Sequence, residues 1–438
     1  MGEGPETGLR LNVRLLPALV GLVLVLQLVA PYRGWMILLV GLGGALLASY
    51  VWARSLCDGL QLTREMRFGW AQVGDRLEER FTLVNENPLP ALWAEATDHS
   101  TMPGYHIDRV AILAGEDSTH WRTQGTCTQR GLFTLGPTSL KTGDPLGVFS
   151  VELRYPRSMP FFVMPPVVSL PSIEVASGGR TGQGRPRPNA PERTVSVATV
   201  REYLPGDSPR WIHWRTSARR DALYVRLFEG VPAGDWWMVL DMNRSVQAGQ
   251  GLDATEEHGV VLAASLADRG LRSGKAVGLV AHGEELAWLR PRGGEGRRWE
   301  ILRALALIGL GQVPLSEVLA QIGPTLGRYA SLIIITPDLG GEWIESLVPL
   351  MRQDITPTVL LLDRASFGEM EADGEGPVRR MTALLSTLGV SHHVVGRELL
   401  DRSALQPGKR GHWEWRVLGT GHAVPVRRPQ DTEWRGLA

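Results

Sequence analysis

The chain has 438 residues, and its 46 Lys and Arg balance its 46 Asp and Glu, so the formal net charge at pH 7 is zero. A content of 43% hydrophobic and 21% charged residues excludes a wholly disordered chain, and charge neutrality argues against a general nucleic-acid binder. The length predicts about three structural units, and two cysteines are too few for a disulfide framework or a four-cysteine zinc site.

The N-terminal part contains two apolar runs without a charged residue, 15–30 and 35–52, joined by a short connector. Each run is slightly shorter than the roughly 20 residues of a membrane-spanning helix, but each can be extended by one or two residues. Two runs in tandem differ from a signal peptide, which has one run and a cleavage site. Residues 1–58 are therefore predicted to form a transmembrane helical hairpin; the alternative is a buried hairpin of a soluble protein.

Basic residues around these runs predict the orientation of the hairpin. Arg10 and Arg14 precede it, Arg54 and Arg64 follow it, and Arg33 alone lies in the connector. The positive-inside rule then places both ends in the cytoplasm. We expect a protein of the plasma (inner) membrane with the bulk of its chain cytoplasmic, in contact with the lipid bilayer.

Residues 59–170 show short alternating apolar runs separated by turn signals such as those at 85–88 and 143–145. Several short strands at this spacing predict a β-sandwich-like domain. No catalytic set is evident in this region, so a spacer or binding module is the default interpretation.

Residues 171–230 combine a Pro-, Gly- and Arg-rich segment (171–193), interpreted as a mobile surface loop, with a dense motif at 200–230. From 231 to 400, apolar strands alternate with amphipathic helices, which predicts a doubly wound α/β domain with a parallel sheet. Residues 401–438 form a Trp-rich tail that either covers a sheet edge or docks a partner. In open α/β sheets, ligands bind beyond the carboxyl ends of the strands, here after Asp241, Gly283, Asp338 and Asp363.

One of these strand ends carries three oxygen-bearing side chains at a spacing of two: Asp241, Asn243 and Ser245. Asp338 follows another apolar strand of the same predicted sheet. A hard cation such as Mg²⁺ is bound by oxygen ligands and retains several waters, so this set suits it. The alternative is that Asp241 and Ser245 only cap the following helix.

The arrangement resembles the metal-ion-dependent adhesion site of von Willebrand factor A domains, whose first motif is D-x-S-x-S. Asn243 replaces the middle Ser of that motif, and Asp338 matches the later Asp of a T-D-G sequence with one residue inserted. The intervening Thr of that family has no match in segment 289–300. The resemblance implies a partial Mg²⁺ site and an A-like fold.

A second resemblance is carried by the motif at 200–230, which is similar to the signature of the bacterial domain-of-unknown-function family 58. Its matching residues are Arg201, Glu202, Tyr203, Pro205, Gly206, Asp207, Pro209, Arg210, Ile212, Trp214, Ala218 and Arg219. Segments 130–132 and 144–149 are similar to a further element of that family. The resemblance implies two membrane helices, a β-rich region and an A-like domain. It also implies partners of two classes, a MoxR-type AAA+ ATPase and a transglutaminase-like membrane protein.

The chemistry of this motif leaves its role open. Residues 201–229 contain six Arg and four acidic residues, and Arg suits bidentate pairing with carboxylates. Asp207 or Glu202 would then hold Arg210 or Arg219 inside a structural knot between domains. The alternatives are a surface that docks a partner and, less favoured, a catalytic role.

Together these features predict a membrane-anchored, cytoplasm-facing, non-catalytic scaffold or adaptor that binds a protein partner through its A-like domain. A structural envelope or cell-wall assembly protein without cation dependence is the alternative. A Mg²⁺-dependent hydrolase is less favoured, because no His or Lys suited to acid–base chemistry lies near either motif.

Overall fold

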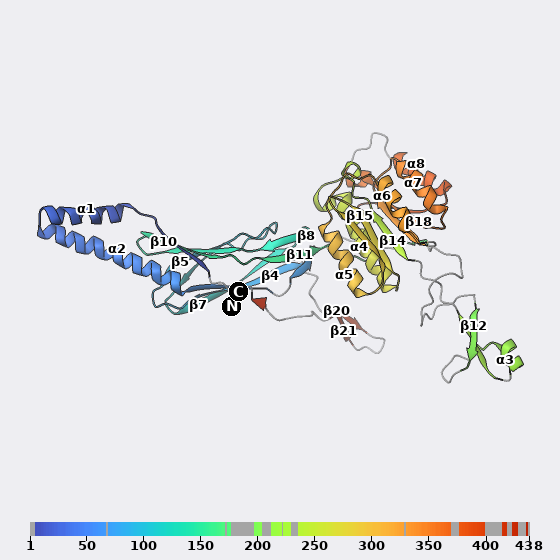
Figure 1. Ribbon diagram of the computed structural model, residues 1–438, viewed down its shortest axis with the longest axis horizontal. Helices are drawn as coiled ribbons and strands as arrows, with labels where there is room; N and C mark the ends of the chain where they lie inside the picture. Colours follow the sequence, from blue (N-terminus) through green and yellow to red (C-terminus); the bar gives the residue numbers. More distant parts are fainter. Residues whose placement is uncertain are drawn as a thin grey trace. The chain divides into compact units, whose positions relative to one another are not determined.

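The computed structural model describes residues 5–66, 69–170, 173–176, 197–203, 212–220, 222–228, 235–327, 330–368, 376–398, 414–417, 423–427 and 435–436. The chain is multidomain, as predicted, and it divides into two compact units. Unit 1 comprises Met1–Met164 with Ala404–Ala438, and unit 2 comprises Pro165–Ser403. Figure 1 shows the helices and strands of both units.

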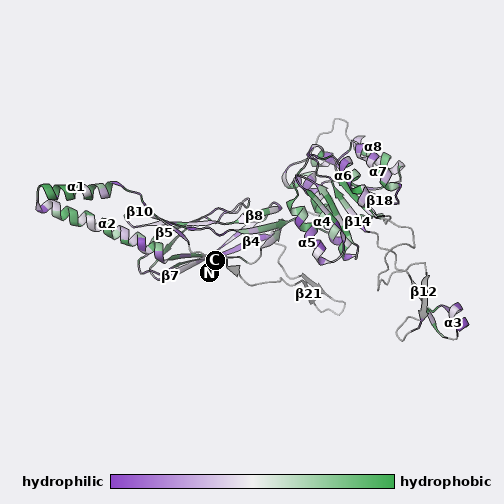
Figure 2. Ribbon diagram, in the orientation of Figure 1, coloured by the Kyte–Doolittle hydropathy of each residue, from purple (hydrophilic) through white to green (hydrophobic). Residues whose placement is uncertain are grey.

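Unit 1 begins with a short strand and two apolar helices, α1 (Leu15–Val29) and α2 (Arg33–Gly59), which pack against each other. α2 is long and apolar enough to cross a membrane, and α1 is a shorter apolar helix. Figure 2 shows hydrophobic residues along most of both helices. Side chains such as Ile37 and Val40 are 73% and 69% exposed, so this surface is not used by the core of the protein itself.

The remainder of unit 1 is β-rich. Its strands form a five-stranded sheet in the order β1-β10-β9-β5-β6, a four-stranded sheet in the order β22-β2-β4-β7, and a three-stranded sheet in the order β3-β11-β8. Their bounds are β1 (Glu6–Leu11), β2 (Leu60–Met66), β3 (Trp70–Gln72), β4 (Arg76–Asn85), β5 (Ala91–Asp98), β6 (Arg109–Leu113), β7 (Asp117–Thr126), β8 (Gly131–Leu135), β9 (Thr138–Gly143), β10 (Phe149–Tyr155), β11 (Met159–Met164) and β22 (Arg435–Gly436).

Alternation of side chains explains why these strands enclose a core. In β4 every second residue is buried, including Leu77, Phe81 and Leu83, as expected for a strand with one face toward the core. The C-terminal end of α2 enters the same core through Ala53 and Leu56, which are fully buried. Helix α2 is therefore continuous with the β-rich fold and is not a separate appendage.

The C-terminal tail includes β20 (Glu414–Val417), β21 (Ala423–Arg427) and β22. β22 pairs with β2 in the register Glu65 to Gly436, so part of the tail extends a sheet edge of unit 1.

Unit 2 contains a mixed six-stranded sheet in the order β16-β15-β14-β17-β18-β19. Its elements are β14 (Trp236–Leu240), α4 (Thr255–Arg272), β15 (Val277–His282), β16 (Leu286–Arg292), α5 (Glu295–Leu307), α6 (Leu315–Ile322), β17 (Ser331–Thr336), α7 (Glu342–Met351), β18 (Thr356–Leu362), α8 (Gly376–Thr387) and β19 (Ser391–Val395). All neighbouring strands are parallel except β15 and β16. The prediction of a purely parallel sheet missed β16, because the three-residue connection 283–285 is too short for a crossover and requires an antiparallel partner.

Helices cover both faces of this sheet. On one face, Gly259 of α4 approaches Leu240, Ile335 and Leu362 so closely that an added methyl group would touch them. On the other face, Trp237 and Val239 belong to a buried cluster built with α6, α7 and α8. Every residue of β14 and β17 is buried, which explains their uninterrupted apolar sequences.

Residues 173–176 differ from the predicted mobile loop. The amide of Ala176 donates to Thr358 Oγ1 at 3.0 Å, and Ser331 Oγ donates to the carbonyl of Ala176 at 3.0 Å. This segment therefore pairs with residues near the starts of β17 and β18. Its prediction as a loop relied on Pro, Gly and Arg content, which does not report such contacts; residues 177–193 lie outside the described residues.

Candidate functional site

The candidate site lies at the carboxyl edge of the unit 2 sheet, where β14 and β17 end side by side. Leu240 is in register with Ile335, and the amide of Asp241 donates to the carbonyl of Ile335 at 2.9 Å. The parallel pairing therefore brings Asp241, which follows β14, next to Thr336, the last residue of β17.

Three hydrogen bonds connect the residues of this edge. Thr336 Oγ1 donates to Asp241 Oδ2 at 2.6 Å, and the amide of Asn243 donates to Asp241 Oδ1 at 3.0 Å. The amide of Asp338 in turn donates to Thr336 Oγ1 at 2.9 Å. Thr336 thus links the two aspartates that the sequence singled out.

The electrostatics of Asp241 are unusual for a carboxylate. It is 4% exposed, and no salt bridge to it is present in the described part of the chain. Burial, with a smaller contribution from the charge of Asp338, raises the pKa of Asp241 from 3.8 to about 6, against the opposing hydrogen bonds from Thr336 and Asn243. A buried carboxylate with a raised pKa gains stabilisation from a cation that approaches it.

The side chain of Asn243 bonds to Ser245 and not to the Asp241 carboxylate. The amide and the hydroxyl of Ser245 both donate to Asn243 Oδ1, each at 3.1 Å. Asn243 thereby caps a short 3₁₀ helix, Arg244–Val246. The N-cap of α4 is Ala254, so neither Asp241 nor Ser245 caps the long helix that follows the loop. One oxygen of Asp338 accepts from the amide of Gly340 at 2.7 Å.

The oxygen atoms at this edge can be compared with the ligands that a metal ion requires. No group of three or more His, Cys, Asp or Glu suited to a metal ion occurs within the described ranges. Mg²⁺, however, is commonly held by one or two carboxylates and several waters. The carboxylates of Asp241 and Asp338, with the Thr336 hydroxyl between them, fit such a water-rich site. The hydroxyl of Ser245 is exposed and retains free lone pairs.

Three residues that support the site were not predicted from the sequence. Gln247 Nε2 donates to the carbonyl of Asp241 at 2.9 Å, and Thr255 Oγ1 donates to Gln247 Oε1 at 2.7 Å. Gly311 donates its amide to the carbonyl of Met242 at 2.8 Å and accepts from the amide of Arg244 at 2.9 Å. Thr336 was also not predicted as a site residue, although its position at the polar end of an apolar strand was a usable signal; β17 ends there, two residues before the predicted end at Asp338.

The signature motif is described only in part. Arg201 and Glu202 lie on β12 (Val197–Glu202), Tyr203 follows them, and Trp214 and Arg219 lie on α3 (Trp214–Arg220). β12 pairs with β13 (Tyr224–Phe228) in an antiparallel hairpin. Pro205, Gly206, Asp207 and Arg210 lie outside the described residues, so the predicted pairing of Asp207 with an arginine stays a prediction.

Within the hairpin, polar contacts anchor α3 to β13. His213 Nδ1 lies 2.7 Å from Thr216 Oγ1, and Ser217 Oγ accepts from the amide of Tyr224 at 2.8 Å. Trp214, a residue of the signature motif, is 66% exposed.

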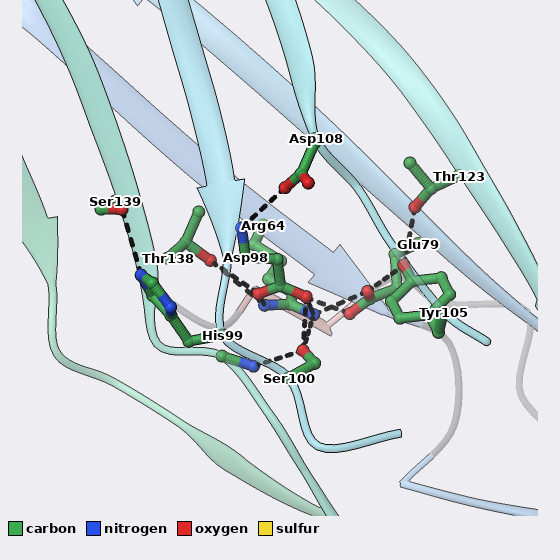
Figure 3. A network of polar contacts seen from close by, with 11 residues as sticks. Arg64, Glu79, Asp98, His99, Ser100, Tyr105, Asp108, Thr123, Thr138 and Ser139 are labelled. Atoms are coloured by element: carbon green, nitrogen blue, oxygen red, sulfur yellow. Dashed lines mark hydrogen bonds and ion pairs between the residues drawn. The ribbon is translucent and has the colours of Figure 1, made fainter. Parts of the chain in front are cut away.

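Unit 1 contains a second polar cluster that sequence reasoning missed entirely (Figure 3). Arg64 donates from Nε and Nη2 to both carboxylate oxygens of Glu79, each at 2.8 Å, and from Nη1 to Asp98 Oδ1 at 2.9 Å. Arg64 also donates to the hydroxyls of Thr138 and Ser100. The side chains of Glu79 and Asp98 are 0% and 2% exposed.

Charge and burial make this cluster a structural element. Burial lowers the pKa of Arg64, but the hydrogen bond and charge of Glu79 and the charge of Asp98 outweigh it and raise that pKa. Burial and the neighbouring Glu79 raise the pKa of Tyr105, whose hydroxyl donates to Glu79. The raised pKa values keep the Arg64 guanidinium charged and the Tyr105 phenol neutral, as expected in a buried polar network whose members are hydrogen-bonded.

Comparisons with known proteins bear on part of the chain. The family described as "Protein of unknown function DUF58" matches residues 199–368, which include the described parts of the signature motif and the two aspartates of the candidate site. A Bacillus subtilis (strain 168) protein named "Uncharacterized protein YeaD" is 24% identical over 288 residues, which are 64% of this chain and 70% of that protein.

Solved structures give weaker likenesses. The CARDB domain of the Pyrococcus furiosus PF1109 protein, in complex with di-metal ions, is 10% identical, with a TM-score of 0.18 over 24% of this chain and 94% of that chain. The Pseudomonas fluorescens alkylpurine DNA glycosylase AlkC is 15% identical, with a TM-score of 0.16 over 34% of this chain and 43% of that chain. Both scores are too low to support an argument about fold or function.

Proposed function

We propose that the protein is a membrane-anchored, non-catalytic adaptor whose unit 2 is von Willebrand A-like and binds a carboxylate of a protein partner through a cation at Asp241 and Asp338. The observation that carries this proposal is the state of Asp241, which is 4% exposed with a pKa raised to about 6 and is linked to Asp338 only through Thr336. A cation held there by two carboxylates retains open coordination positions for a partner carboxylate.

The proposed anchor is a hairpin of α1 and α2. α2 has the length and composition of a spanning helix, and the two helices contact each other. Arg10, Arg14 and Arg54 flank the hairpin on one side, against Arg33 on the other. The positive-inside rule therefore favours a cytoplasmic location for both units at the plasma membrane.

Support for an adaptor role comes from the residues around the site. Asp338 has its amide and one carboxylate oxygen engaged by Thr336 and by the local backbone. The Thr336 hydroxyl donates to Asp241, but Thr336 is fully buried, which disfavours it as a nucleophile toward an external substrate. The resemblance to family 58 favours a MoxR-type AAA+ ATPase as the partner, with a transglutaminase-like membrane protein in the same system.

The test is co-purification of the tagged full-length protein from its host in Mg²⁺-ATP or in EDTA, read by mass spectrometry. We expect an AAA+ ATPase to be retained with Mg²⁺ and lost in EDTA, and Asp241→Ala to lose it in both buffers. Asp363→Ala is the matched control, because Asp363 also ends a strand of this sheet but caps its own turn through Ala365. An ATPase retained equally in EDTA refutes the proposal that partner binding depends on a cation. Recovery of cell-wall enzymes alone favours a structural envelope role.

A further inference from the structure

The turn between β9 and β10, residues 144–149, is one of the two segments that resemble family 58 outside the main motif, and the proposed function gives it no role. Asp144 organises this turn. Its Oδ1 accepts from the amide of Phe149 at 2.6 Å and its Oδ2 from the amide of Leu146 at 2.9 Å. Gly147 has a φ of +67°, a conformation that glycine adopts without strain.

This turn buries its polar side chain and exposes its apolar one. Asp144 is 3% exposed, whereas Leu146 at the tip is 61% exposed. Single exposed leucines are common on protein surfaces and need no explanation by themselves. A leucine held outward by a turn whose carboxylate faces inward is a more specific arrangement, and its location in unit 1 indicates what it contacts.

The tip lies on the membrane side of the β-rich fold. Tyr50 of α2 contacts Phe149 with ring centroids 5.8 Å apart, and the amide of Leu62 donates to the hydroxyl of Tyr155 at 2.8 Å. β10 therefore runs alongside the chain from Tyr50 toward Leu62. Residues 144–148 precede Phe149 and so lie at the Tyr50 end of β10.

Two further hydrogen bonds link this end of the β-rich fold to the helices, one near the start of α1 and one near the start of β5. The amide of Asn12 donates to the carbonyl of Val148 at 2.9 Å, so the segment that leads into α1 is attached to the turn. Trp52 Nε1 donates to the carbonyl of Pro90 at 3.1 Å. Beyond Pro90, Leu92 and Trp93 are 45% and 38% exposed.

The length of α2 indicates the depth of the 144–149 turn relative to a bilayer. An α-helix rises about 1.5 Å per residue, so residues 33–52 of α2 span about 30 Å, the thickness of the hydrocarbon core. If α2 crosses the membrane, Trp52 lies at the lipid–water interface. The tip of the 144–149 turn then lies at the same depth or slightly deeper, with the exposed Arg14 nearby for headgroup phosphates.

We infer that the turn at residues 144–149 is a membrane-contacting wedge that places Leu146 in the interfacial region of the phospholipid bilayer. This inference rests on the proposed membrane anchor. Lipid is the proposed occupant because the turn is bonded to the segment that leads into α1 and lies at the Tyr50 end of β10, with Leu146 exposed in the described part of the chain. The contact gives the β-rich fold a second attachment to the membrane beside the helical hairpin, which restricts its tilt.

The test places a fluorescent NBD label at Leu146→Cys in the full-length protein, reconstituted in nanodiscs of phosphatidylcholine and phosphatidylglycerol. Val40→Cys on α2 and Leu132→Cys on β8 are the matched controls, with native side chains 69% and 49% exposed. The unsubstituted chain is the labelling blank, because Cys57 and Cys127 are both buried. Quenching is measured with nitroxides on the lipid headgroup, nitroxides on the acyl chain, and aqueous iodide.

We expect the label at position 146 to be quenched most strongly by headgroup nitroxides, the label at 40 by acyl-chain nitroxides, and the label at 132 by iodide alone. A label at 146 that behaves like the one at 132, while position 40 is quenched by lipid, refutes the wedge and leaves the anchor intact. A label at 146 shielded from all three quenchers indicates a protein contact and also refutes it. Absence of lipid quenching at 40 overturns the anchor, and the wedge with it.

Discussion

Replacing Arg64 by Met removes the one cation of the buried unit 1 cluster while preserving most of the side-chain volume. Glu79 and Asp98 are then left with side-chain exposures of 0% and 2% and without a countercharge. Removing one partner of a buried ion pair costs about 3–5 kcal/mol, because the remaining charge stays desolvated. Arg64 serves two carboxylates and two hydroxyls, so we expect the upper part of that range.

A surface variant serves as the control for Arg64→Met, and the pH dependence of stability gives a second test. Arg154→Met breaks a surface pair in the same unit, where Arg154 is 57% exposed, and should cost less than about 1 kcal/mol. In the Arg64 variant, burial without a countercharge raises the carboxyl pKa values above their unfolded values, so the lost stability should be partly regained as the pH falls. Urea-dependent hydrogen exchange of the β2 and β4 peptides measures both effects. Equal effects of the two variants, or a loss that increases toward acid, would contradict the reasoning.

Two further predictions concern unit 2. The pKa of Asp241 is raised in the folded state from 3.8 to about 6. In Mg²⁺-free buffer the free energy of unfolding should therefore fall as the pH rises from 3.8 to about 6. Asp241→Asn should abolish this pH dependence and increase the free energy of unfolding by at most about 3 kcal/mol at neutral pH. Urea unfolding across this pH range checks it, with an unchanged slope as the contrary result. Gly311→Ala should destabilise unit 2 by about 1–3 kcal/mol, since a Cβ there would lie 2.4 Å from the carbonyl oxygen of Gly283. Gly296→Ala in α5 has open space and should be neutral or stabilising in the same melts.

Hydrophobic patterning predicted the strands of unit 2 well because those strands are buried on both faces. β14, β17 and β18 each contain four or five consecutive apolar residues. β14 and β18 end one residue before the predicted ends at Asp241 and Asp363, whereas β17 ends at Thr336, two residues before the predicted end at Asp338. β16 is an edge strand in which four apolar residues, 286–289, are followed by Arg290, Pro291 and Arg292, so its apolar run is short and is interrupted by charge. Its existence depends on a short hairpin connection, which periodicity does not report.

The buried cluster of unit 1 shows where sequence reasoning fails in principle. Arg64, Glu79 and Asp98 lie on β2, β4 and β5, and each is an ordinary charged residue in an alternating strand. The contact of Arg64 with Glu79 depends on the register between β2 and β4, which are neighbours in one sheet. The contact with Asp98 depends on how that sheet packs against the sheet that contains β5, and local periodicity reports neither. The same limit applies to Thr336, whose contact with Asp241 arises from the register between β14 and β17.

Three aspartates follow strands of the same sheet, and the sequence alone treats them alike. Asp363 accepts from the amide of Ala365, which is the ordinary use of an aspartate after a strand. Asp338 caps the turn at Gly340 but stays partly exposed. Asp241 alone is buried with its charge opposed by its surroundings. Burying a carboxylate without a countercharge costs desolvation free energy, so such a group is usually paired or binds a metal ion. The negative charge of the neighbouring Asp338 increases this cost. A shared cation would remove it for both, so the cost itself is the reason to look for a ligand at this edge.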